Sequence, residues 1–110
     1  MREDYIYKIC TKKEWDDFKY IKSWNGTEKD IKDGFIHLSK KEQVKQTLNR
    51  YFLKQKDLIL LVLKTENLKN LIWEKSTDGD RFPHLYSNLE LDNIIASKEI
   101  IGDQHLFEDL

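Results

Sequence analysis

The chain has 110 residues, the size of one domain, and its 19 basic and 20 acidic residues leave a net charge of −1. Because charges of both signs are interspersed, the sequence carries no one-sided basic surface of the kind that nucleic acid or a membrane requires. One cysteine cannot form an internal disulfide, and the longest apolar run, residues 58–63, is far shorter than the ~20 residues that span a bilayer. We therefore expect a cytoplasmic protein with a single globular domain over residues 1–101 and a loosely held tail over residues 102–110. Composition does not determine its oligomeric state.

The first third of the chain predicts a strand followed by a helix. Residues 5–10 are aromatic and β-branched, which favours a strand. Thr11 followed by Glu14 is a capping-box signature, which predicts a helix from there to about residue 23. The predicted inner stripe of this helix consists of Trp15, Phe18 and Ile21. Residues 27–33 are polar and show no clear period, so we expect a loop or a single helical turn.

The middle of the chain predicts a short strand that leads into a second helix. Residues 35–38 form the strand, and Ser39 with Glu42 three positions later predicts the cap of the next helix. The apolar face predicted for that helix consists of Val44, Leu48, Tyr51 and Phe52.

Later segments predict mostly strands. Residues 58–63 show no alternation, which indicates a strand covered on both faces. Residues 71–75 alternate, so Ile72 and Glu74 should lie on one face of a further strand. Turn residues follow at 77–80, and a last strand is expected around residues 94–95. The predicted fold class is α+β, with two main helices packed on a mixed, mostly antiparallel sheet of about five strands.

His37 is the first residue that points to chemistry. Alternation places it beside Phe35 on one face of its strand, while the opposite face must be core. A neutral imidazole can grip a hydroxyl or phosphate oxygen, and a helix beginning at Ser39 would favour an anion nearby. The alternative is a buried histidine that donates to a backbone carbonyl, with Ser39 acting only as a cap.

A second histidine motif, Arg81-Phe82-Pro83-His84-Leu85-Tyr86, strengthens the functional interpretation. Pro83 fixes the backbone before His84, and Tyr86 would share the face of His84 in an extended chain. If the strands form a hairpin, Glu74 and Arg81 would join them in a polar cluster. Taken singly, Glu74 is typical of an exposed strand residue and Arg81 of a solvated loop charge.

Other chemistries fit less well. A triad of Ser39, His84 and Glu74 lacks the glycine pattern of a nucleophile elbow. The two histidines and Glu74 do not have the spacing of a compact metal motif, so we assign no metal ligands. Cys10 has no neighbouring base and is interpreted as core.

Together the two motifs resemble the domain of unknown function 952 family. The resemblance spans about residues 5–96. It is carried by Tyr5-Ile6-Tyr7-Lys8-Ile9, Asp33-Gly34-Phe35-Ile36-His37-Leu38-Ser39, Gln43-Val44, Thr47, the strand at residues 57–62, Trp73-Glu74 and Phe82-Pro83-His84-Leu85-Tyr86. The chain has Thr77 and Ser87 where the family usually has arginine and glycine. Whether Arg81 substitutes for that arginine is open.

The resemblance implies a compact relative of the ADP-ribosyltransferase fold, a split sheet whose cleft holds NAD in active members. The run Ile36-His37-Leu38-Ser39 is similar to a cleft-lining strand of tRNA 2'-phosphotransferases. The resemblance gives Glu74 and His84 as candidate catalytic residues. The candidate ligand-binding residues are His37, Ser39, Thr47, Arg81, His84 and Tyr86.

Two main functional hypotheses follow, with a metal-dependent hydrolase as a distant third. The first is a small enzyme, or an enzyme-derived domain, that binds NAD, ADP-ribose or another phosphate-bearing ligand. The alternative is a non-catalytic binding or interaction module that keeps the fold without the chemistry. This hypothesis is prompted by Thr77, which stands where the resembled family usually has arginine.

Overall fold

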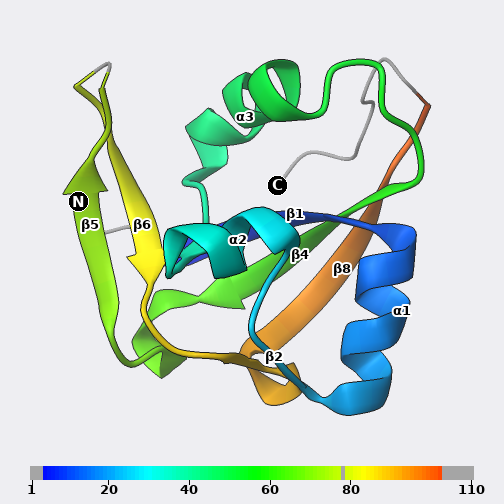
Figure 1. Cartoon of the computed structure of the whole chain (residues 1–110), viewed down its shortest axis with the longest axis horizontal. Coiled ribbons are helices and arrows are strands. Elements are labelled where there is room, and N and C mark those ends of the chain that lie inside the picture. Colours follow the sequence, from blue (N-terminus) through cyan, green and yellow to red (C-terminus); the bar gives the residue numbers. More distant parts are fainter. Residues whose placement is uncertain (1–3, 78, 103–110) are drawn as a thin grey trace.

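The fold is built around β4 (Leu58–Lys64), the central strand of a three-stranded antiparallel sheet in a computed structural model that describes residues 4–77 and 79–102 (Figure 1). β1 (Tyr5–Thr11) and β8 (Ile94–Ile100) pair with its two edges. All six apolar residues of β4 are buried, as the absence of alternation predicted. Residues 59, 61 and 63 face one apolar cluster and residues 58, 60 and 62 face another, so both sides of the sheet are covered.

A second antiparallel sheet carries both histidine motifs. Its strand order is β3 (Ile36–His37), β6 (Arg81–Leu85) and β5 (Leu71–Lys75), and β5 and β6 form the hairpin on which the predicted polar cluster depends. A separate ribbon pairs β2 (Ser23–Trp24) with β7 (Leu89–Glu90). The prediction of a mixed, split sheet of about five strands is wrong in strand number, because short strands such as β2 form only through pairing with distant residues, and all pairings of the described strands are antiparallel. The α+β class is confirmed.

Within residues 4–77 and 79–102, three α-helices lie around the sheets: α1 (Lys12–Ile21), α2 (Glu28–Asp33) and α3 (Val44–Tyr51). Three short 3₁₀ helices span Lys41–Gln43, Thr65–Asn67 and Leu91–Asn93. The capping box of Thr11 and Glu14 is present at the start of α1. Ile21 and Tyr51 are 52% and 55% exposed, so neither belongs to the buried face that the pattern predicted, whereas Phe52 packs against the core.

Ser39 does not cap a helix, contrary to the sequence prediction. Its backbone N–H and C=O pair with Tyr7 in an isolated β-bridge, at 2.9 and 2.8 Å. α3 begins only at Val44, after the 3₁₀ turn. The bridge therefore joins the end of the β3 segment to the first sheet and holds Ser39 almost fully buried.

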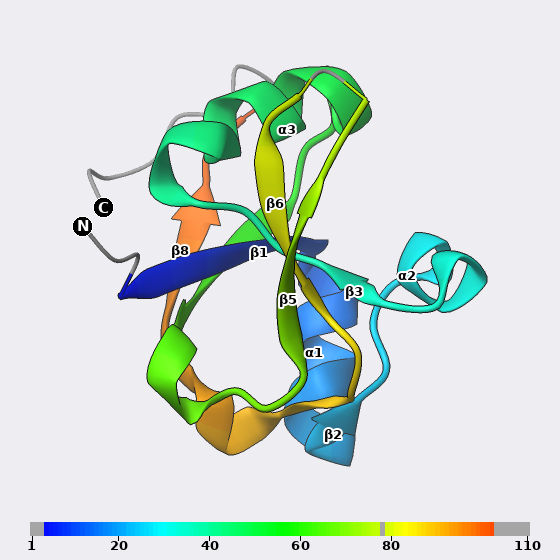
Figure 2. The same ribbon diagram turned by 90° about the vertical axis from the view of Figure 1, so that its left-hand side faces the viewer.

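Viewed from the side, α3 lies near the tip of the β5–β6 hairpin, while α2 lies beyond β3 (Figure 2). Lys40 and Gln43, just before α3, contact Asp80 in the turn between β5 and β6. Among the described helices, none is long and apolar enough to cross a membrane. Most of the predicted tail, residues 103–110, lies outside the described residues.

Candidate functional site

The two predicted histidines are brought directly opposite one another by the pairing of β3 with β6. Their ring centroids are 5.6 Å apart. Phe35 contacts both, stacking on His84 at 4.1 Å and lying tilted against His37 at 4.5 Å. The opposite faces of these strands carry the buried core residues Ile36 and Leu85, as alternation requires. The sequence motifs therefore meet as one structural unit.

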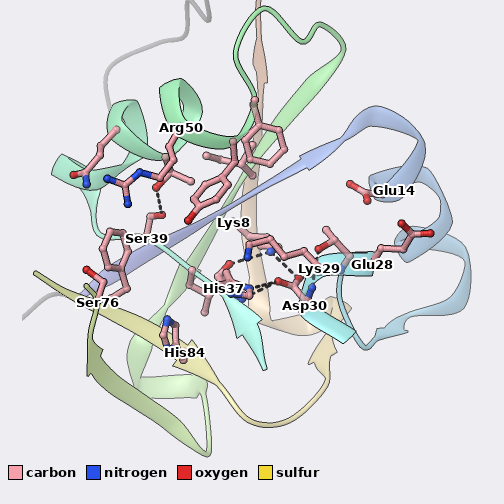
Figure 3. A pocket seen from close by; sticks show the side chains of 18 of the residues that line it. Lys8, Glu14, Glu28, Lys29, Asp30, His37, Ser39, Arg50, Ser76 and His84 are labelled. Carbon is pink, nitrogen blue, oxygen red and sulfur yellow. Dashed lines mark hydrogen bonds and ion pairs between the residues drawn. The ribbon is translucent and has the colours of Figure 1, made fainter. Parts of the chain in front are cut away.

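Both histidines line a pocket of about 650 Å³. Of the other predicted ligand-binding residues, Ser39 and Thr47 also line it, and their hydroxyl oxygens are 3.2 Å apart. The close-up in Figure 3 shows side chains from β1, the helices and the hairpin converging on this space. The volume falls within the ~300–1,000 Å³ usual for small-molecule sites.

His84 is held in place by Glu74, which lies beside it in the β5–β6 hairpin. Nδ1 of His84 is 2.7 Å from Glu74 Oε1, and the Tyr86 hydroxyl donates to the same oxygen at 2.6 Å. The hydrogen bonds from Tyr86 and His84 lower the pKa of Glu74, and the bond to Glu74 raises the pKa of Tyr86. Within the described part of the chain, Nε2 of His84 has no hydrogen-bond partner. A carboxylate that orients Nδ1 and leaves Nε2 open is the arrangement needed for general acid–base chemistry.

Arg81 does not join this cluster. Strand alternation places it on the face of β6 opposite His84, and its Nη1 donates to the Trp73 carbonyl at 3.4 Å. Thr77, by contrast, lines the pocket. The position that usually carries arginine in the resembled family thus faces the pocket without a charge.

Asp30 is the residue at the site that the sequence reasoning missed. It is 2% exposed, and its carboxylate lies 2.7 Å from Lys8 Nζ and 2.6 Å from His37 Nδ1. It also accepts hydrogen bonds from the backbone amides of Thr27 and His37. Burial alone would raise the pKa of Asp30, but the hydrogen bond from His37 and the adjacent Lys8 ammonium outweigh it and hold the pKa well below its ordinary value. Figure 3 shows this cluster in the middle of the pocket.

A signal for Asp30 was present in the sequence. Thr27 followed three residues later by Asp30 is a capping box with aspartate in place of glutamate, and it caps α2. Its burial depends on Lys8, which reaches it from β1 and also donates to the His37 carbonyl at 2.9 Å. Local sequence gives no indication of that long-range contact.

His37 lies between two carboxylates. Nδ1 faces Asp30, and Nε2 is 3.0 Å from Asp33 Oδ2. Ionised carboxylates only accept, so both contacts are hydrogen bonds when the ring carries both protons. His37 is therefore a fixed element of the pocket, whereas His84 retains an open nitrogen. Across residues 4–77 and 79–102, no group of three His, Cys, Asp or Glu side chains is arranged to hold a metal ion.

These features define a small α+β protein with a histidine-lined pocket between a sheet and its helices. Residues 9–97 match the family model described as "Protein of unknown function (DUF952)", and the chain belongs to this family. The crystal structure of protein CC0527 from Caulobacter crescentus is similar, with 37% identity, a TM-score of 0.84, and coverage of 94% of this chain and 93% of that one. The solution structure of CC0527 is similar at 40% identity and a TM-score of 0.79, over 88% and 84% of the two chains. Among curated proteins there is no match.

Proposed function

We propose that the pocket binds a small phosphate-bearing ligand of the NAD or ADP-ribose type, in the cytoplasm. The observation that carries this proposal is the direct opposition of His37 and His84 on the wall of a 650 Å³ pocket. The same pocket presents Arg50 and Lys75, which suit a phosphate. Its hydroxyls and aromatic rings suit a ribose and a flat base.

His84 is the residue we assign to chemistry, with Glu74 as its orienting partner. Because Nδ1 is held by Glu74, Nε2 is the nitrogen that can take or give a proton at a bound ligand. Tyr86 fixes the same carboxylate oxygen and therefore acts through Glu74. In an ADP-ribosyl transfer from NAD, such a group would take the proton of the accepting atom as that atom bonds to the ribose and nicotinamide leaves. The family resemblance to ADP-ribosyltransferases favours that reaction class by analogy.

Thermal unfolding with NAD or ADP-ribose tests the proposal. A ligand at 100 times its Kd stabilises the folded state by about 2.7 kcal/mol, which raises the Tm of a domain this size by roughly 10 °C or more. His84→Ala should remove most of this shift. Glu99→Gln, on the exposed surface of β8, is the control and should retain it. No shift with either ligand at millimolar concentration would reject the proposal.

The alternative, a non-catalytic binding module, is favoured by one observation. Thr77 lines the pocket at the position where the family resemblance implies arginine, and Arg81 donates to the Trp73 carbonyl instead. This alternative predicts ligand binding without turnover. NAD turnover that disappears in His84→Ala, with the fold retained, would refute it.

A further inference from the structure

The two ends of the pocket differ in charge and in hydrogen-bonding character. At the end beneath α3 lie Arg50 and, from the hairpin, Lys75 and Thr77. At the opposite end lie Glu14 of α1 and Glu28 of α2. Figure 3 shows Arg50, Ser39 and Ser76 on one side of the Lys8–Asp30–His37 cluster and the two glutamates on the other. Lys29 also lines the pocket beside Glu28, but its ammonium is paired with Asp33 at 3.1 Å, so the two glutamates make this end the more acidic one.

The α3 end is rich in donors. Ser39 and Thr47 share one hydrogen bond, which uses only one of their two hydroxyl protons. Either oxygen can donate in that bond, so the second proton is on Ser39, which is 4% exposed, or on half-buried Thr47, and none of the described residues accepts it. A hydroxyl donor that lines the same pocket as a guanidinium is an arrangement that can bind an anionic oxygen.

The opposite end is rich in acceptors. Glu14 uses Oε1 for the capping box, and none of the described residues bonds its other oxygen. The carboxylate of Glu28 likewise has no partner among residues 4–77 and 79–102. Ionised carboxylates repel phosphate and accept hydrogen bonds from sugar hydroxyls, as they do from ribose in dinucleotide sites.

We infer that the ligand is a ribose phosphate, free or as part of a larger nucleotide. Its phosphate binds Arg50 and the Ser39–Thr47 hydroxyls, and its sugar hydroxyls donate to Glu14 and Glu28. This inference rests on the proposed function. It adds the chemical class of the ligand and the orientation in which the ligand lies in the pocket. The internal Lys8–Asp30–His37 cluster, which is already neutralised by its own ion pair, separates the two ends.

Calorimetric titration with ribose 5-phosphate, ADP-ribose and inorganic phosphate tests the assignment. Arg50→Gln should weaken all three by about tenfold or more, because it removes a charge-assisted hydrogen bond. Glu28→Gln should weaken the binding of ribose 5-phosphate and leave the binding of inorganic phosphate unchanged. Lys45→Gln on α3 and Glu99→Gln on β8 are matched controls outside the pocket and should change none of them. If Arg50→Gln and Glu28→Gln reduce the affinity for ribose 5-phosphate more than the affinity for ADP-ribose, the ligand is a free sugar phosphate. If they reduce the affinity for ADP-ribose more, the ligand is a nucleotide.

The outcomes separate this inference from the proposed function. If wild type binds ADP-ribose but Glu28→Gln tightens ribose 5-phosphate, the glutamates repel the ligand and the direction is wrong. If O-phosphoethanolamine binds more tightly than ribose 5-phosphate and loses that advantage in Glu28→Gln, the glutamates serve an amine and the sugar assignment is wrong. If neither NAD nor ADP-ribose binds wild type, the proposed function itself fails.

Discussion

Replacing Asp30 with asparagine should destabilise the fold severely. The substitution keeps the size of the side chain but leaves Lys8 Nζ, 5% exposed at the side chain, without its carboxylate at 2.7 Å. Breaking a buried ion pair by removing one partner costs about 3–5 kcal/mol, because the remaining charge stays desolvated. The free energy of unfolding of a domain is about 5–15 kcal/mol in total, so Asp30→Asn should unfold at a much lower urea concentration than wild type.

The reasoning can be separated from a general loss of packing by a double variant. Asp30→Asn leaves the Lys8 charge buried without a partner, and Lys8→Met removes that charge. The double variant should therefore be more stable than Asp30→Asn alone. Urea unfolding of wild type, both single variants and the double variant measures this directly. The reasoning is refuted if Asp30→Asn costs less than about 1 kcal/mol, or if adding Lys8→Met lowers stability further by its full single-variant cost.

The same pair predicts an acid dependence. The pKa of Asp30 is lower in the folded protein than its ordinary value of 3.8, so the folded state binds fewer protons than the unfolded state as the pH falls past that value. The stabilisation is therefore complete above about pH 5 and is lost progressively below about pH 4. In Asp30→Asn this part of the acid-induced loss should be absent.

Three further predictions follow from individual contacts. Gly26→Ala should lower the Tm more than Gly34→Ala. Both glycines have positive φ, but only at Gly26 would a Cβ meet Asp30 atoms at 2.6 Å. Equal decreases in Tm would contradict this. Glu74→Gln should bring the pKa of Tyr86 down toward its ordinary value, measured by ultraviolet titration of the phenol, with Tyr20→Phe simplifying the spectrum; an unchanged pKa would exclude the hydrogen bond. Burial raises the pKa of Cys10 to about 12, so a thiol reagent at pH 8 should label the unfolded chain and leave the folded chain unlabelled, and rapid labelling of the folded chain would show that Cys10 is accessible.

The sequence predicted the parts of this site that depend on local pattern. Alternation correctly placed His37 opposite a core face, and the apolar run of β4 correctly indicated a strand covered on both sides. The capping box at Thr11 was also confirmed, because a cap depends only on residues three positions apart.

The missed features all depend on distant partners. Ser39 is a residue type that commonly caps a helix, but its backbone N–H and C=O both form hydrogen bonds with Tyr7. Asp30 lies in a polar segment without a period, and only Lys8 on β1 makes its burial tolerable. The division into three sheets follows from two-residue pairings that a propensity cannot encode.

The pairing of β3 with β6 has a consequence for how the protein acquires its site. His37 and His84 are nearly fifty positions apart in the chain, and β1 meets β4 across a similar separation. Each half can form locally, His84 with Glu74 in the β5–β6 hairpin and His37 with Asp30 beside α2, but the loop-closure entropy must be overcome before the two halves meet. We expect slow folding for the domain's size, and we expect ligand-binding capacity to appear together with the last structural phase of refolding. The pocket is thus a direct reporter of completed folding.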